Sequence, residues 1–212
     1  YSLSGLMYLS NSDKNRIYHN LSSSANAELA KNSLFLDVFA NVNQQLLNQN
    51  LGASSDLVSG SQNTTTTYTY GFSPYWTQRW GNFADSYLRY DYNEVKFSGR
   101  QGSNDSVGQN LNFQMNSGKV FNRYFWDLNY RYQQTAYDNS LTRDTTTELT
   151  YITLGAHISR KLDLRVRLGY EDYGDSFILD SEGNVTDEEN SGFGWTVGGN
   201  WHPNQRTTLD FR

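Results

Sequence analysis

Hydrophobic and polar residues alternate along most of the chain with a period of two. In the segment LFLDVFANV, Leu34, Leu36 and Val38 occupy one register, whereas Asp37 and Asn41 occupy the other. The same alternation recurs in RYFWDLNYRYQQ, in DLRVRLGYED and in SGFGWTVGGNW. A helix would distribute these apolar positions around its axis, whereas a strand collects them on one face. The pattern therefore predicts an all-β protein.

Eleven strands are expected over the whole length. They fall near 1–10, 17–29, 34–47, 64–78, 83–97, 107–117, 123–137, 145–158, 164–174, 191–201 and 206–212. Short connections at 30–33, 79–82, 118–122, 159–163 and 202–206 alternate with mostly longer polar ones at 11–16, 48–63, 98–106, 138–144 and 175–190. Short turns at one end and long loops at the other are typical of outer-membrane barrels. Strands of this length also match the roughly 9–11 residues that cross a bilayer at a tilt.

We therefore predict one antiparallel up-and-down transmembrane β-barrel domain over residues 1–212, of the outer-membrane type. Hydrophobic residues make up only 36% of the chain, so a conventional interior would be thin, whereas aromatic residues reach 15%, which argues against disorder. A polar inner face is reasonable if it lines a wet lumen. The alternative is a secreted, soluble antiparallel sandwich or solenoid with a tyrosine-rich surface.

The strand count suggests a piece of a larger assembly. Single-chain bacterial barrels normally have an even number of strands with both ends on the periplasmic side, and eleven strands leave the two chain ends on opposite sides. The segment RTTLDFR at the end is also short. We expect further strands at one or both ends; a closure that uses strands from another copy is the rival explanation.

Charge and cysteine content exclude several classes. A net charge of −5 makes broad nucleic-acid binding unfavourable, because such binding normally needs a basic face. The absence of cysteine removes disulfides, thiolate metal sites and cysteine nucleophiles. No run of about 18 apolar residues is present, so no transmembrane helix is expected.

Two sets of residues follow from the barrel interpretation. The charged positions assigned to the polar, lumen-lining register are Asp37, Asp85, Arg89, Asp91, Asp127, Arg131, Glu148, Arg165, Arg167 and Glu171. The aromatic residues assigned to girdles at the membrane interfaces are Trp76, Trp80, Tyr90, Tyr92, Tyr124, Trp126, Trp195 and Trp201. Tyr18, Phe35, Phe39, Tyr75 and Tyr87 fall on the polar register, where they could stack on sugar rings.

Four segments also carry a family likeness. They are ANAELAKNSLFLDVFANVNQQ from Ala25, YTYGFSPYWTQRWGNFADSYLRYDY from Tyr68, LGYEDYGD from Leu168, and W-x-P-x-x-R-T-x-L from Trp201 to Leu209. In this order the chain resembles the outer-membrane β-barrel proteins associated with PEP-CTERM/exosortase systems, which lie beside exopolysaccharide genes. The resemblance implies an outer-membrane location in a Gram-negative bacterium and a role in exopolysaccharide secretion or surface assembly. It carries no catalytic residues over, and members of the family usually continue past the last segment.

Catalytic and metal chemistry has few candidates. His19, His157 and His202 are isolated in the sequence, and a barrel-embedded hydrolase would have to gather Asp85, Asp91, Glu148 and His157 at the barrel mouth. The acidic stretch LDSEGNVTDEEN offers Asp180, Glu182 and Asp187 as weak Ca²⁺ ligands, but its glycine does not match the EF-hand spacing. We predict no catalytic residue, no resident metal and no cofactor.

The predicted function is a non-enzymatic, porin-like pore or scaffold in exopolysaccharide export. Outer-membrane lipid is the expected partner, with polysaccharide, export-machinery proteins and further copies of the chain left open. The alternatives are a closed-barrel binding or structural protein and the hydrolase described above.

Overall fold

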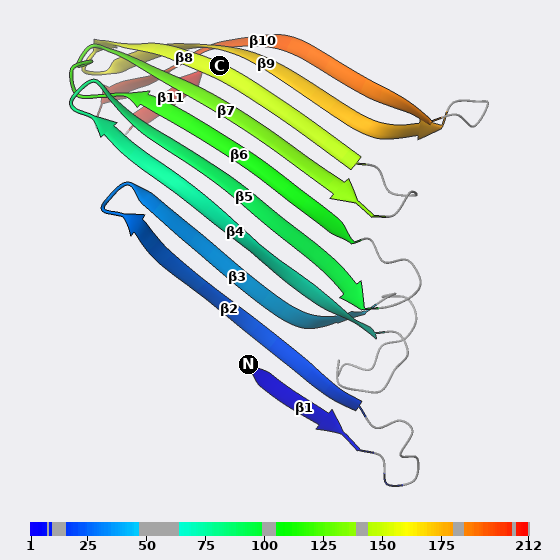
Figure 1. Cartoon of the computed structure of the whole chain (residues 1–212). Helices are drawn as coiled ribbons and strands as arrows, with labels where there is room; N and C mark the ends of the chain where they lie inside the picture. Colours follow the sequence, from blue (N-terminus) through cyan, green and yellow to red (C-terminus); the bar gives the residue numbers. More distant parts are fainter. Residues whose placement is uncertain are drawn as a thin grey trace.

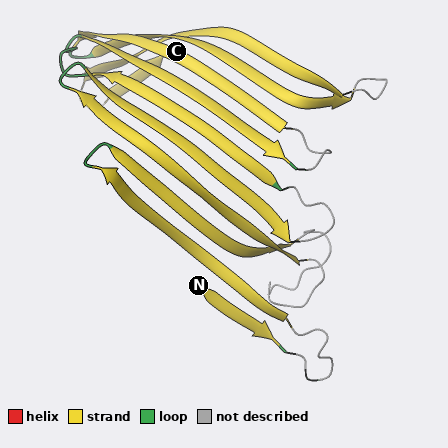
Figure 2. Cartoon of the chain, viewed as in Figure 1, coloured by secondary structure: helices red, strands yellow, loops and turns green. Residues whose placement is uncertain are grey.

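The computed structural model forms a single antiparallel sheet whose eleven strands follow one another in chain order (Figure 1). It describes residues 1–7, 9, 16–46, 64–98, 105–138, 144–179, 185–204 and 207–211. The strands are β1 (Ser2–Leu6), β2 (Arg16–Ala30), β3 (Leu34–Leu46), β4 (Thr64–Trp80), β5 (Ala84–Ser98), β6 (Ser106–Ser117), β7 (Tyr124–Tyr137), β8 (Asp144–Ser159), β9 (Leu162–Leu179), β10 (Val185–Asn204) and β11 (Thr207–Phe211). Figure 2 shows strands and connections alone across the part of the chain that the structure describes. The predicted all-β, up-and-down antiparallel arrangement is confirmed.

The register of the ladders gives the sheet two chemically distinct faces. One ladder runs through Trp76, Leu88, Phe113 and Tyr130 on four consecutive strands. The neighbouring ladder, one residue along each strand, runs through Tyr75, Arg89, Asn112 and Arg131. Because successive side chains of a strand point to opposite faces, the first ladder belongs to an apolar face and the second to a polar face.

The sheet has almost no interior. Ala84 is the one described hydrophobic residue in the buried class, at 1% exposure, whereas Phe193 and Trp195 on the apolar face remain 70% and 71% exposed. A single curved layer leaves both faces without a second layer of protein (Figure 1). Soluble proteins rarely leave a contiguous apolar surface of this extent uncovered. Within the described residues the apolar face is therefore a candidate contact surface.

The short connections from β2 to β3, β4 to β5, β6 to β7 and β8 to β9 gather at one end of the sheet, the turn end, and the opposite ends of these strands form the loop end (Figure 1). In two of the short turns a backbone hydrogen bond closes four residues, from Ser33 N to Ala30 O at 3.1 Å and from Phe83 N to Trp80 O at 3.0 Å. Asn32 and Gly81 within these turns have positive φ angles of 55° and 59°. Asparagine and glycine tolerate this left-handed conformation better than other residues. Local sequence thus defines the turn end.

Two details of the predicted fold need correction. The sequence pattern predicts a long loop over 175–190, but β9 and β10 extend into this segment and remain paired as far as Leu179 and Val185. The apolar residues that end at Leu179 continue the strand, although they do not alternate with polar ones. The sheet is also open: within the described residues β1 pairs with β2 and β11 with β10, but the two edge strands do not pair with each other.

Among the residues that the structure describes, no helix has the length and apolar character to cross a membrane.

Candidate functional site

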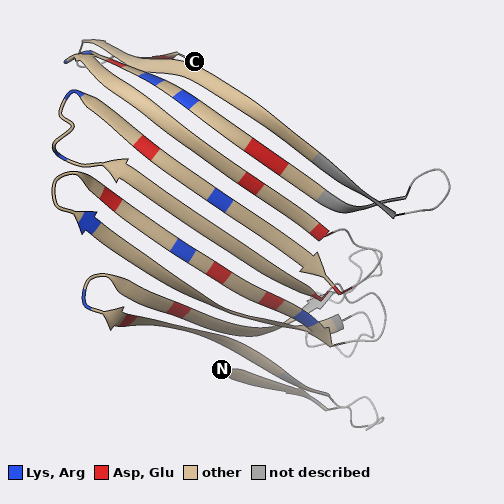
Figure 3. Cartoon of the chain, turned by 45° about the horizontal axis from the view of Figure 1, so that its top comes forward, with Lys and Arg blue, Asp and Glu red and all other residues tan. Residues whose placement is uncertain are grey.

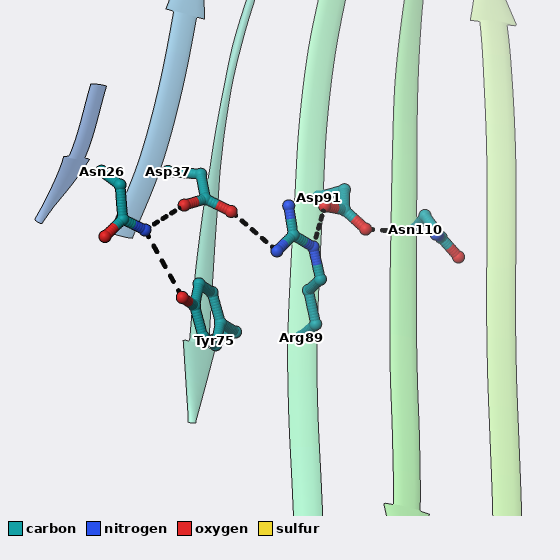
Figure 4. Close-up of polar contacts among 6 residues, drawn as sticks. All are labelled: Asn26, Asp37, Tyr75, Arg89, Asp91 and Asn110. Carbon is teal, nitrogen blue, oxygen red and sulfur yellow. Dashed lines mark hydrogen bonds and ion pairs between the residues drawn. The ribbon is translucent and has the colours of Figure 1, made fainter. Parts of the chain in front are cut away.

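The polar face carries a continuous chain of side-chain hydrogen bonds across β2, β3, β5 and β6 (Figure 4). Arg89 Nη1 donates to Asp37 Oδ2 at 2.8 Å, and Arg89 Nε donates to Asp91 Oδ1 at 2.6 Å. Asn26 Nδ2 donates to Asp37 Oδ1 at 2.5 Å, and Asn110 Nδ2 donates to Asp91 Oδ2 at 3.2 Å. The two carboxylates therefore share one guanidinium, and an amide completes each end of the chain.

Arg89 reaches Asp37 across an intervening strand. Asp37 lies opposite Ser73 on β4, and Ser73 is 5% exposed. A residue this small leaves room for the long arginine side chain above it, whereas a larger residue would separate β3 from β5 on this face. The pattern of small and large residues on β4 therefore decides which charges meet.

Aromatic rings on the polar face pack beside this network toward the turn end. The rings of Phe35 and Tyr75 stack at a centroid distance of 4.9 Å, and Tyr87 lies 6.1 Å from Tyr75. The Arg89 guanidinium lies 5.3 Å from the centre of the Tyr75 ring, within the range of a cation–π contact. Flat rings beside charged groups are a suitable surface for hydrated sugars.

Further polar contacts follow on β7 to β9. Arg131 Nε donates to Asn112 Oδ1 at 3.2 Å, and Asp127 Oδ1 accepts from Asn129 Nδ2 at 2.6 Å. The Arg167 guanidinium lies 4.4 Å from the centre of the Tyr151 ring. Figure 3 shows charges of both signs spread over β7 to β9 and along β5. The polar face is thus charged over most of its width, with both signs interspersed.

Most of the charged residues predicted for the polar face share its register. The ladders align Asp85 with Asn116, Asp91 with Asn110, Asp127 with Thr153 and Glu171 with Leu149, and Asp37, Arg89, Arg131, Arg165 and Arg167 occupy the same alternating positions. At the turn end, Arg79 Nε donates to Asp85 Oδ1 at 2.8 Å. These nine residues therefore share one face of the sheet.

The prediction for Glu148 was wrong. Glu148 pairs with Tyr132 and lies on the register of Ile152 and Leu154, so it belongs to the apolar face. The sequence TTTELTYITL alternates weakly in this region, because threonines occupy both registers and leave the phase undetermined. The ladder to β7 determines the phase instead.

All the aromatic residues predicted as girdle positions lie on the apolar face by register, and three of the tryptophans form a straight inclined line. The ladder from Trp76 crosses to Tyr130 on β7, and Trp126 is four residues closer to the turn end. The ladder from Trp126 crosses to Val197 on β10, and Trp201 is again four residues closer to the turn end. The line through Trp76, Trp126 and Trp201 therefore drops four residues over every three strands.

Charged residues on the apolar face gather toward the loop end, and Glu94 and Glu148 define a second inclined line there. Among the residues whose side chains the structure describes, the charged members of this register are Glu94, Lys96, Asp144, Glu148 and Asp172, and all lie on the loop side. The ladder from Glu148 crosses to Tyr90 on β5, and Glu94 is four residues further toward the loop end. This line has the same slope and direction as the tryptophan line. Tyr70, Tyr92, Tyr132, Tyr170 and Trp195 lie within about two residues of it.

The residues proposed for hydrolysis are not brought together. Asp85 binds Arg79 and Asp91 binds Arg89, with both carboxylates on β5, whereas His157 Nδ1 lies 2.6 Å from Asp163 Oδ1 between β8 and β9. Strands three positions apart are roughly 14 Å from each other, and Glu148 lies on the other face. His19 and His202 are on β2 and β10.

The described residues contain no group of three histidine or acidic side chains that could hold a metal ion. The predicted Ca²⁺ ligands Asp180 and Glu182 lie outside the described residues, as does the side chain of Asp187.

Sequence reasoning missed two members of the polar network. Asn26 and Asn110 do not stand out in the sequence, because an isolated asparagine in a strand carries no chemical signal of its own. Their positions opposite Asp37 and Asp91 depend on the strand register. With the strand register known, these two asparagines could have been found as the polar residues directly opposite a carboxylate on the neighbouring strand.

Comparison with known proteins gave no match to a family model, to a curated protein or to a solved structure.

Proposed function

We propose that this chain forms the wall of an outer-membrane β-barrel and acts as a non-enzymatic pore or scaffold in exopolysaccharide export. In this arrangement the apolar face contacts lipid and the polar face lines a water-filled lumen. The protein works passively, because a polar, charge-lined surface lowers the barrier for hydrated solutes. No bond is made or broken in the solute.

The two parallel inclined lines on the apolar face carry the membrane part of the proposal. Four residues along a strand correspond to ~14 Å, and three strand spacings also correspond to ~14 Å. Lines of constant depth would therefore run at roughly 45° to the ladders, close to the strand tilt of membrane barrels. Tryptophan on one boundary, and carboxylates with tyrosines on the other, are what two membrane–water interfaces favour. A water-soluble sheet has no reason to keep these residues at constant depth.

The depth of the tryptophans tests this part directly. Variants that retain Trp76, Trp126 or Trp201 alone, with the other tryptophans replaced by phenylalanine, are placed in vesicles whose lipids carry bromine at defined depths. We expect the same quenching profile from all three, because they lie on one line. Tyr87→Trp in a background without other tryptophans is the matched control on the polar face. It should be quenched by aqueous iodide instead.

Three different depths, or quenching by iodide alone, would contradict the membrane assignment. The pore itself is tested separately by conductance in planar bilayers, where discrete channels are expected. A protein that inserts at the expected depth but never conducts would favour the alternative of a closed barrel that binds or organises surface polymer.

The link to exopolysaccharide is supported by the family resemblance and by the aromatic and charged character of the polar face. Sugars combine flat apolar ring faces with hydroxyl edges, which suits Phe35, Tyr75 and Tyr87 beside Arg89. Cells that lack the protein should release less polysaccharide into the medium while the cell-associated pool rises. An unchanged distribution in such cells would argue against a role in export.

A further inference from the structure

Two arginines on the polar face of β9 differ from Arg89 in having no acidic partner among the described residues. Arg89 is held by two carboxylates, whereas no described carboxylate lies within ion-pair distance of Arg165 or Arg167. Arg167 Nε makes a long hydrogen bond of 3.4 Å to Thr153 Oγ1, and its guanidinium stacks on Tyr151. The pair therefore presents two charges that the described part of the sheet leaves uncompensated.

Small residues on β10 leave space open on one side of these arginines, whereas on the β8 side the Phe125 ring occupies the place above Gly155. Arg165 lies opposite Gly155 on β8 and Gly198 on β10, and Arg167 lies opposite Thr153 and Thr196. Arg165, Arg167, Thr196 and Gly198 line a cavity of about 110 Å³. At ~30 Å³ for each water molecule in the liquid, the cavity has room for a carboxylate group with its contacts.

The described acidic groups on the same face are already engaged or distant. Asp163 lies 2.6 Å from His157 Nδ1. Asp127 accepts from Asn129 and lies two strands from Arg167, across Thr153, which corresponds to ~10 Å between the backbones. Asp210 lies opposite Asn200, on β11, two strands from β9. Glu171 is four residues from Arg167 along β9, which corresponds to ~14 Å. An oxyanion entering the cavity would therefore meet two guanidinium groups before any of these carboxylates.

Flat rings border the same cluster. A Cβ atom on Gly155 would lie 2.0 Å from the Phe125 ring, so this ring covers Gly155 directly beside Arg165. Tyr151 lies under Arg167 on the other side. Arginine forks bind oxyanions through paired N–H donors, and aromatic faces contact the apolar faces of sugar rings. The two features occur together here.

We infer that Arg165 and Arg167 form a binding site for the carboxylate of an acidic saccharide, with Phe125 and Tyr151 beside the sugar ring. The inference deepens the proposed function and rests on it for the saccharide as the source of the oxyanion. It assigns to this part of the polar face a preference for uronic-acid units over neutral sugars.

Equilibrium binding of tri-galacturonate to the detergent-solubilised protein, by calorimetry, tests the site. The trimethyl ester of the same trisaccharide supplies the neutral arm, and inorganic phosphate supplies an oxyanion without a sugar. We expect the acid to bind about tenfold or more tightly than the ester, with an affinity that falls as salt is added. Phosphate should bind more weakly than the acid, because it has no ring to contact the aromatic side chains.

The double variant R165Q/R167Q should lose about tenfold or more of the affinity for the acid and leave the ester unchanged. The variant R165K/R167K should retain part of the affinity, since it keeps the charge without the fork. Arg79→Gln, which removes one positive charge from an exposed position at the turn end of β4, is the control for loss of surface charge and should bind as the unmodified protein does. Far-ultraviolet circular dichroism verifies that the sheet is retained.

Equal affinity for the acid and the ester, or full affinity in R165Q/R167Q, would overturn the site. Phosphate binding as tight as the acid would overturn its assignment to a saccharide. The assay needs neither a membrane nor transport. A negative binding result would therefore overturn the arginine site without affecting the conductance test of the pore. A negative conductance result would overturn the pore without affecting the binding test.

Discussion

Replacement of Arg89 by glutamine should be among the most damaging single changes on the polar face. Arg89 makes two charge-assisted hydrogen bonds, and its side chain and those of Asp37 and Asp91 are only 27%, 34% and 27% exposed. A hydrogen bond to a charged group contributes about 1.5–3 kcal/mol, and solvent screening reduces this at partly exposed sites. R89Q also leaves two carboxylates facing one another without a cation. We expect a loss of about 2–4 kcal/mol in the free energy of unfolding.

A triple variant separates the loss of favourable contacts from the repulsion that remains. D37N/R89Q/D91N removes both negative charges together with the cation and can retain amide hydrogen bonds among the three positions. It should therefore be more stable than R89Q, by about 1–2 kcal/mol. Urea unfolding of the refolded protein in detergent, followed by tryptophan fluorescence, gives both values.

Added salt provides a second check. Screening should raise the stability of R89Q relative to the unmodified protein, because the repulsion between Asp37 and Asp91 weakens. A loss below about 0.5 kcal/mol in R89Q, or a triple variant less stable than R89Q, would refute the reasoning. Either result would mean that solvent already screens these three charges.

Three further predictions concern the two faces and the turns. Leu168→Lys lies between the two inclined lines on the apolar face and should lower the free energy of unfolding in lipid by about 2–4 kcal/mol. The control Gln114→Lys on the polar face of β6 should change it by less than about 1 kcal/mol. Equal effects of the two variants on unfolding in vesicles would argue against a lipid-facing surface. Gly199→Ala brings a Cβ to 2.4 Å from a backbone oxygen and should lower the free energy of unfolding by about 1–3 kcal/mol. Gly194→Ala on the same strand meets nothing within 4 Å and should be tolerated. Urea midpoints that rank the two variants the other way would count against this packing of β10 on its neighbours. Gly81→Val forces a β-branched residue into a left-handed turn and should cost about 1–2 kcal/mol, seen as a lower thermal midpoint than that of the neighbouring control Asn82→Val.

Much of the fold follows from alternation alone. The segment from Leu34 to Val42 and the segment from Tyr124 to Tyr132 alternate clearly, so their strands and faces could be predicted. Where both registers carry residues of the same kind, alternation does not determine the phase. Glu148 sits among threonines, and the acidic end of β10 contains charges on both registers. In such segments the pairing with the neighbouring strand determines which residues face which side. That pairing cannot be read from a single sequence.

The candidate site divides in the same way. The sequence identifies Asp37, Arg89 and Asp91 as polar-register charges, but not that one arginine serves both carboxylates across β4. The sequence likewise places Arg165 and Arg167 on the polar register, but it does not show that these two arginines lack the acidic partners that Arg89 has. Whether an arginine has an acidic partner depends on inter-strand geometry. The partner of Arg89, Asp37, is more than fifty positions away in the sequence and two strands away in the sheet.

The constant drop of four residues for every three strands also sets a dimension. If the strands stand at roughly 45° to the membrane normal, each occupies about 7 Å of perimeter instead of the ~4.8 Å of an upright strand. The shear of the cylinder is then fixed at about four-thirds of a residue per strand, whatever the strand count. Eleven strands provide a perimeter of roughly 75 Å, and each strand added to the ring, from any source, widens its diameter by about 2 Å. In the proposed barrel the diameter would thus grow in equal steps, and the spacing of the three tryptophans sets the size of each step.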